Sequence, residues 1–256
     1  MNINLIELSH QTEALNAITK VLEDVRITTN NPIYQNPIID IKDDKNKIYS
    51  NIDKIWNGEM EYYNSNDFTP SKIPAIPKDM RKRDEGDILG IDARLETGTG
   101  KTYIYTRLMY EMNKLYGFNK FIILVPSSPI KEGTKSFIEA DYSKQHFADY
   151  YPEKSIRLEV LNAQKRSKAG RKMFPTAIAN FARGTRHEKN KINALLMTDK
   201  MLISKATMEK DDYDQTLFGE FTQPYKALEE TKPIVIIDEP HRFRKENVAY
   251  KAIVEK

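Results

Sequence analysis

The feature that most constrains the fold is a glycine-spaced loop ending in Lys-Thr, residues 95–102, with the sequence LETGTGKT. The apolar run before it, residues 88–91, predicts a buried strand, and the apolar spacing of residues 103–116 predicts a helix that Gly117 ends. Glycine lacks a Cβ, so the backbone can curl and turn successive N–H groups toward the phosphates of a nucleotide. The pattern therefore predicts a phosphate-binding loop.

Each polar residue of the loop has an expected task. Lys101 adds a positive charge over the β and γ phosphates, and the Thr102 hydroxyl is a hard oxygen ligand of the kind that Mg²⁺ prefers. The expected nucleotide contacts are Thr97, Gly98, Thr99, Gly100, Lys101 and Thr102. Leu95 stands where the common pattern has glycine, so an ordinary turn between a strand and a helix is the alternative.

A second motif lies near the end of the chain. The β-branched run at residues 234–237 predicts a buried parallel strand, and Asp238 and Glu239 follow it directly. Open α/β sheets bind ligands at the carboxyl edge of their strands. We expect Asp238 to hold Mg²⁺ through its waters, and Glu239 to orient and deprotonate the attacking water. A solvated strand end is the alternative for this motif taken alone.

Composition excludes several classes of protein. The net charge of +3, from 40 basic and 37 acidic residues, is too small to indicate nucleic-acid binding by itself. The absence of cysteine excludes disulfides and thiolate metal sites. No apolar stretch approaches a membrane span, and residues 1–5 do not resemble a secretory signal. We therefore expect a cytoplasmic protein without membrane contact.

Three regions follow from the patterning. Residues 1–27 contain an amphipathic helix over 8–18, in which Gln11 could both donate to and accept from an adenine edge. An exposed helix glutamine is the alternative. Residues 28–87, rich in proline and polar side chains, predict a loop-rich insertion with one short helix over 40–56. Residues 88–256 form the predicted phosphate-loop core.

In the core, predicted strands alternate with helical segments, which indicates an α/β fold with a mostly parallel sheet and helices on both faces. The strands are predicted at residues 121–125, 156–161, 194–197 and 234–237. Polar turns follow two of them, at residues 126–131 and 198–200. These turns are expected at the same edge of the sheet as the phosphate loop.

Several of these motifs, in this order, resemble superfamily 2 helicases and translocases, and most closely the restriction subunit of type III restriction enzymes. Residues 96–102 resemble the family's first motif, the segment FIILVPSSPIKEG at 121–133 its DNA-backbone motif, and residues 238–241 its DEPH box. The resemblance implies a RecA-like P-loop NTPase fold and makes Gln11 the adenine-reading glutamine of an ATP site. It assigns DNA contacts to Pro126, Ser127 and Lys131, and the coupling of ATP to DNA to His241. Thr198 and Lys200, at the polar end of another strand, are expected to face the DNA backbone as well.

The resemblance further implies an ATP-dependent DNA translocase that acts with a modification methyltransferase subunit in restriction-modification. Such proteins have a second RecA-like lobe, which supplies arginine fingers, and an endonuclease domain. We expect residues 1–256 to be the first lobe only, from a truncated form or a degenerate gene fragment, with negligible ATPase by itself. Two other functions stay open: a helicase-like lobe of another DNA or RNA remodelling ATPase, and a nucleotide-gated binding module without turnover.

Overall fold

The computed structural model describes residues 5–63, 69–81, 89–96, 98–162, 173–211, 213 and 222–240. The chain divides into two compact units. We call residues 6–28 and 38–112 the P-loop unit, because they include the glycine loop, and residues 1–5, 29–37 and 113–256 the sheet unit.

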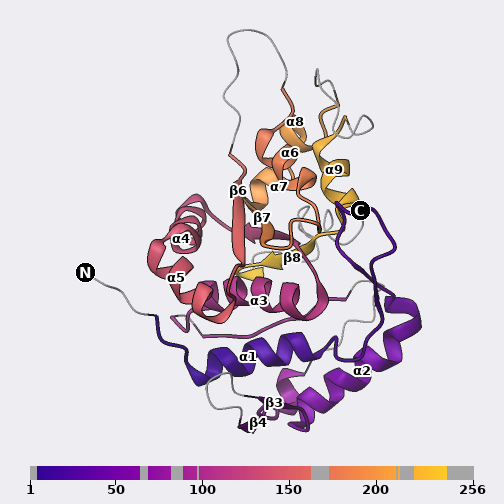
Figure 1. The fold of residues 1–256 in the computed structure, drawn as a ribbon, viewed down its shortest axis with the longest axis vertical. Helices are drawn as coiled ribbons and strands as arrows, with labels where there is room; N and C mark the ends of the chain where they lie inside the picture. Colours follow the sequence, from indigo (N-terminus) through magenta and orange to yellow (C-terminus); the bar gives the residue numbers. More distant parts are fainter. Residues whose placement is uncertain are drawn as a thin grey trace. The chain divides into compact units, whose positions relative to one another are not determined.

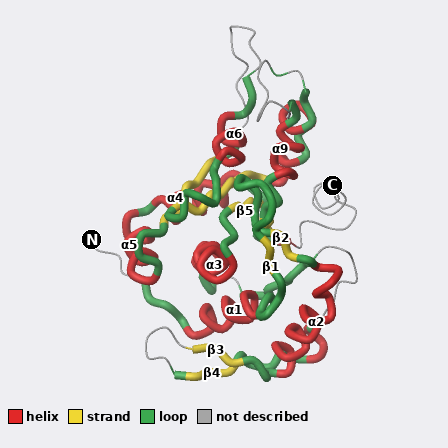
Figure 2. Tube along the Cα trace, turned by 45° about the vertical axis from the view of Figure 1, so that its right-hand side comes forward, coloured by secondary structure: helices red, strands yellow, loops and turns green. Residues whose placement is uncertain are grey.

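The P-loop unit is mainly helical, with two small antiparallel strand pairs, β1 with β2 and β3 with β4 (Figure 2). Its elements are α1 (Ser9–Lys20), β1 (Ile27–Thr28), β2 (Ile38–Ile39), α2 (Ile41–Asn57), β3 (Glu61–Tyr63), β4 (Pro70–Lys72), the 3₁₀ turn η1 (Lys78–Met80) and α3 (Lys101–Tyr116), whose last turn belongs to the sheet unit. The three predicted helices are confirmed as α1, α2 and α3. Gly117 ends α3 with a φ of +76°, a left-handed conformation that glycine adopts at low cost.

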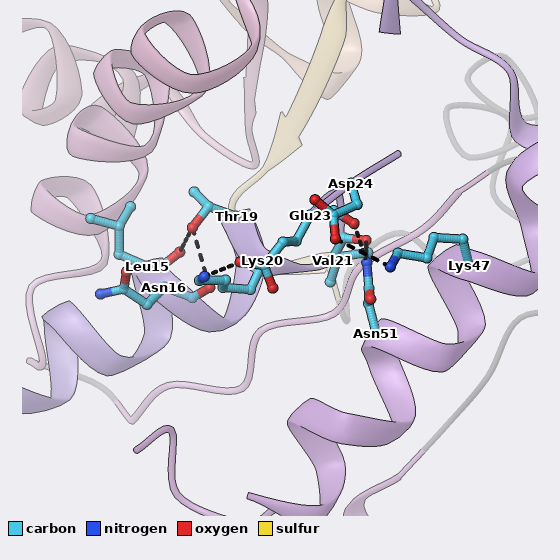
Figure 3. A network of polar contacts seen from close by, with 9 residues as sticks. All are labelled: Leu15, Asn16, Thr19, Lys20, Val21, Glu23, Asp24, Lys47 and Asn51. Carbon is cyan, nitrogen blue, oxygen red and sulfur yellow. Dashed lines mark hydrogen bonds and ion pairs between the residues drawn. The ribbon is translucent and has the colours of Figure 1, made fainter. Parts of the chain in front are cut away.

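Apolar side chains of α2 form a core with residues that follow α1 and residues in or beside the β3–β4 pair. The buried members of this core are Val21, Val25, Ile48, Ile55, Met60, Tyr62 and Ile73. Polar contacts also join the two helices (Figure 3): Asn51 Nδ2 of α2 donates to the carbonyls of Val21 at 3.1 Å and Glu23 at 2.8 Å, and Lys47 pairs with Asp24. These bonds satisfy carbonyls that the end of α1 leaves without a helical partner.

The prediction of a strand before the glycine loop is wrong for residues 89–91, which are the residues of this run that the structure describes. Residues 89–91 adopt neither helix nor strand, and the Ile91 side chain is 41% exposed. A strand requires a hydrogen-bonded neighbour, and residues 89–96 make no backbone–backbone hydrogen bond with another described residue. Residue 88 lies outside the described part of the chain.

The sheet unit is an α/β layer structure around a parallel sheet, in which Figure 1 labels β6, β7 and β8. Its four strands follow the order β6-β7-β5-β8. Its elements are β5 (Lys120–Val125), α4 (Ser128–Glu139), α5 (Asp141–Tyr150), β6 (Ser155–Val160), α6 (Thr176–Arg183), β7 (Lys191–Thr198), α7 (Asp199–Leu202), α8 (Lys205–Met208), α9 (Pro224–Glu230) and β8 (Ile234–Ile237). The four predicted strands and the parallel, helix-flanked α/β fold are confirmed.

Side chains alternate along each strand, so the two faces of the sheet carry different apolar sets. On one face Ile122, Leu124, Leu195 and Met197 join a core with residues of α6, α7, α8 and α9. Helices α6 and α9 lie side by side over this core (Figure 2). Helix α4 packs along β5, β6 and β7 and contributes no residue to this core, which places it on the other face. Burial on both faces explains why the two central strands, β5 and β7, are mostly apolar.

The amino end of β5 is tied to the segment of residues 29–37. Asn36 Oδ1 accepts from the amides of Asn119 at 2.8 Å and Lys120 at 2.9 Å, and Asn36 Nδ2 donates to the Lys120 carbonyl at 2.8 Å. Arg186 Nη2 donates to the Asn31 carbonyl at 2.7 Å. A fully buried asparagine thus supplies the backbone pairing that a neighbouring strand would supply.

The side chain of Lys120 is itself fully buried, and its Nζ donates to the carbonyls of Phe181 and Ala182 at the end of α6. Burial lowers the pKa of Lys120 from 10.5 to about 7, and the nearby Arg157 acts in the same direction, while Glu188 opposes them. Near neutral pH this lysine is therefore divided between its charged and neutral forms.

Candidate nucleotide site and sheet edge

The glycine loop has the backbone that a phosphate cradle needs. Gly98 has a φ of +85° and Gly100 a φ of +82°, values that residues with a Cβ rarely adopt. Helix α3 starts directly afterwards at Lys101, and the Gly100 carbonyl accepts from the amide of Ile104 at 3.1 Å. Thr99 Oγ1 donates to the Glu96 carbonyl at 2.8 Å and closes the turn. Thr97 lies outside the described residues.

The polar groups of the loop are backbone amides, an ammonium and a hydroxyl. The backbone N–H groups of Gly98, Thr99 and Gly100 donate to no acceptor in the part of the chain that the structure describes. Lys101 and Thr102 occupy the first turn of α3, and both are partly exposed. Amides at a helix N-terminus and a lysine ammonium are donors suited to phosphate oxygens, and a threonine hydroxyl is an oxygen ligand of the kind that Mg²⁺ prefers.

Helix α1 brings Gln11 to this loop. Gln11 Nε2 donates to the Thr99 carbonyl at 3.0 Å, and Gln11 Oε1 accepts from the amide of Leu8 at 3.2 Å. The side chain is 6% exposed and helps to cap α1. One N–H donor and one oxygen lone pair of the carboxamide remain for another partner. An adenine edge requires one donor and one acceptor of this kind.

The sequence reasoning missed His10, whose Nε2 lies 3.1 Å from the same Thr99 carbonyl. No spacing rule could have identified it, because consecutive residues of a helix point in directions about 100° apart. Only the position of the loop carbonyl, between the two side chains, lets both of them reach one oxygen.

Asp238 and Glu239 follow β8 at the carboxyl edge of the sheet. The amide of Asp238 donates to the Leu124 carbonyl at 2.9 Å and extends the pairing of β8 with β5. Glu239 has a φ of +61°, a left-handed conformation that costs about 1 to 2 kcal/mol for a residue with a Cβ. Strained backbone of this kind is frequent at functional sites. His241 lies outside the described residues.

The predicted DNA contacts are placed by β5 and β7, whose carboxyl ends lie side by side because Val125 pairs with Thr198. Pro126 and Ser127 are partly exposed, Thr198 is buried and Lys200 is exposed. Lys131 is only 6% exposed, and its Nζ donates to Asn162 Oδ1 at 2.5 Å. The exposed Asn162, two residues beyond β6, is another residue that the sequence reasoning missed.

The structure therefore brings Gln11, Thr99, Gly100, Lys101 and Thr102 together within the P-loop unit, and it places Asp238, Glu239 and the polar turns at one edge of the sheet unit. Among the described residues, no group of three or more His, Asp and Glu side chains is arranged to hold a metal ion. No described helix has the length and hydropathy to cross a membrane.

Comparison with known proteins agrees with this geometry. The family model described as "Type III restriction enzyme, res subunit" matches residues 5–256. The Res subunit of the StyLTI type III restriction-modification enzyme from Salmonella typhimurium strain LT2 is 49% identical over 168 residues, which are 65% of this chain and 17% of that protein. The EcoP15I Res subunit from Escherichia coli is 42% identical over 155 residues, which are 60% of this chain and 16% of that protein.

The EcoPI Res subunit of Escherichia phage P1 matches to the same degree, at 42% identity over 155 residues. The matched residues thus span about a sixth of the length of these relatives. A family match that extends over almost the whole chain shows the family directly, and the chain belongs to the type III restriction enzyme Res subunits.

Proposed function

We propose that residues 1–256 are the ATP-binding motor lobe of a DNA translocase or helicase, the restriction subunit of a type III restriction enzyme. The observation that carries this proposal is the glycine loop, whose backbone amides have no described acceptor while Gln11 of α1 contacts its Thr99 carbonyl. Family membership supports the same function. In the proposed lobe, residues 1–27 recognise adenine, residues 28–87 are an insertion, and residues 88–256 form the P-loop core.

The proposed division of roles follows from chemistry. The amides of Gly98 to Gly100 and the ammonium of Lys101 bind the phosphates, with Thr97 as a further contact. Thr102 and Asp238 hold Mg²⁺, which supplies charge neutralisation on the phosphate oxygens. Glu239 orients the attacking water and accepts its proton, and His241 couples the ATP site to DNA.

The proposed partners are DNA and the modification methyltransferase subunit, and the proposed compartment is the cytoplasm. Ser127, Thr198 and Lys200 meet the DNA backbone at the carboxyl edge of the sheet, beside Pro126. Lys131 is 6% exposed and uses one of its three N–H donors on Asn162, so it presents few atoms to a phosphate. The endonuclease activity belongs to the proposed full-length protein.

Calorimetry with ATP and Mg²⁺ tests the site. Wild-type protein binds, and Lys101→Ala loses binding because the charge over the phosphates is gone. Lys54→Ala is the matched control, an exposed lysine of α2 in the same unit, and it binds as the wild type does. Equal affinity for wild type and Lys101→Ala would remove the loop from the proposed site.

Turnover is tested separately. This 256-residue chain is expected to hydrolyse ATP negligibly, with or without duplex DNA, because an arginine finger contributes roughly 10³ to 10⁵ in rate and comes from the second lobe in the superfamily that the chain resembles. A chain extended through a second lobe is expected to show DNA-stimulated ATPase. DNA-stimulated turnover by residues 1–256 alone, abolished by Glu239→Gln, would show that the site is complete without that lobe.

A further inference from the structure

Two side chains of α1 converge on a single loop oxygen. His10 Nε2 lies 3.1 Å and Gln11 Nε2 lies 3.0 Å from the Thr99 carbonyl. A carbonyl oxygen only accepts hydrogen bonds, so the His10 contact requires the tautomer that carries its proton on Nε2. A carbonyl has two lone pairs, which these two donors can occupy together.

The orientation of this carbonyl determines the orientation of the next amide. The peptide bond between Thr99 and Gly100 is trans, as are all described peptide bonds, and in a trans peptide the C=O and the following N–H point in opposite directions. With the Thr99 carbonyl held toward α1, the Gly100 N–H points away from α1. Among the described residues this N–H has no acceptor.

Glycine is the only residue type that this arrangement accommodates at position 100. The φ of +82° at this position suits glycine, and a Cβ there would lie 2.5 Å from Gln11 Nε2. At Gly98, which has a similar φ of +85°, a Cβ would meet nothing within 4 Å. The close approach of α1 is therefore specific to the peptide that His10 and Gln11 hold.

We propose that His10 is a positioning residue for phosphate binding, which acts with Gln11 to hold the Thr99–Gly100 peptide so that the Gly100 N–H faces the phosphates. This inference rests on the proposed function, because it deepens the role of the same ATP site. It separates two tasks on α1: Gln11 has groups left for the base, whereas His10 acts on the phosphates alone through the loop backbone.

The test measures affinity for inorganic tripolyphosphate, ATP and GTP, each with Mg²⁺, by calorimetry on the 256-residue protein. His10→Phe keeps a ring but removes the donor, and it weakens all three ligands by the same factor, about tenfold, which is typical for one misaligned hydrogen bond to a charged group. His10→Gln restores an N–H donor and recovers most of the affinity. His187→Phe, at an exposed histidine of the sheet unit, leaves all three affinities unchanged.

The outcomes separate this inference from the proposed function. If wild-type protein binds none of the ligands, both are overturned. If wild type binds and His10→Phe binds equally well, or loses affinity for ATP alone, only the role of His10 is overturned. Nitrogen-15 NMR of the wild type provides a readout that needs no variant: neutral His10 carries its proton on Nε2, and a proton on Nδ1 instead would contradict the proposal.

Discussion

Alanine substitutions at the two loop glycines separate backbone strain from crowding against α1. Both glycines have nearly the same φ, +85° at Gly98 and +82° at Gly100. An alanine in this left-handed region costs about 1 to 2 kcal/mol at either position. At Gly100 the new Cβ would also lie 2.5 Å from Gln11 Nε2, whereas at Gly98 it would meet no atom within 4 Å. Gly100→Ala must therefore displace Gln11 from the Thr99 carbonyl.

The expected loss of unfolding free energy follows from these terms. Gly98→Ala loses about 1 to 2 kcal/mol through strain alone. Gly100→Ala loses about 1 kcal/mol more, because it also breaks the hydrogen bond from Gln11 Nε2 to the Thr99 carbonyl. Gly133→Ala is a reference for the sheet unit, to be followed by circular dichroism: Gly133 lies within α4 with open space around its added Cβ, and alanine is favoured in helices by up to about 1 kcal/mol.

Urea denaturation followed by tryptophan fluorescence measures these losses. Trp56 is the only tryptophan of the chain and lies in α2, so its emission reports the P-loop unit that contains both loop glycines. Gly100→Ala should also lose the adenine preference of the site, while Gly98→Ala should keep it. Equal destabilisation by the two substitutions would refute the reasoning, because it would show that α1 does not crowd Gly100.

Three further predictions concern charge and specificity. The pKa of Lys120 is about 7 in the folded protein and 10.5 as its ordinary value, so the unfolded chain binds more protons between these pH values. The free energy of unfolding should therefore rise by roughly 1 kcal/mol per pH unit from pH 7 to 9. Urea titrations followed by circular dichroism should show that Lys120→Met abolishes this rise. Gln11→Ala should let GTP displace a labelled nucleotide as well as ATP does, since adenine and guanine present opposite donor patterns, and an unchanged preference for ATP would remove Gln11 from the base site. DNA binding should be weak and salt-sensitive. In a filter-binding or anisotropy titration, Lys200→Ala should reduce the slope of log affinity against log salt concentration by about one. Tight binding that does not depend on salt would contradict a contact with the DNA backbone.

Tertiary structure alone decided which atoms meet. Nothing local indicated that His10 would share the Thr99 carbonyl, that Lys131 would be buried against Asn162, or that Asn36 would pair with the backbone of Lys120. These contacts join residues 31 to 89 positions apart, and side-chain spacing carries no information about such distances. The expected strand before the glycine loop was wrong at the described residues 89–91 for a related reason, because an apolar run becomes a strand only where a neighbour completes its hydrogen bonds.

The sequence by itself determined seven of the elements and the residue types of the loop. Helices α1, α2 and α3 and strands β5, β6, β7 and β8 follow from periodicity and from β-branched runs, which are local properties of the chain. The glycines of the loop and the acids after β8 were likewise evident, because phosphate and Mg²⁺ restrict the residue types that can bind them. Orientation was not evident: the direction of the Gly100 N–H depends on a peptide plane that α1 holds from outside the motif, and only the folded chain brings that helix to the loop.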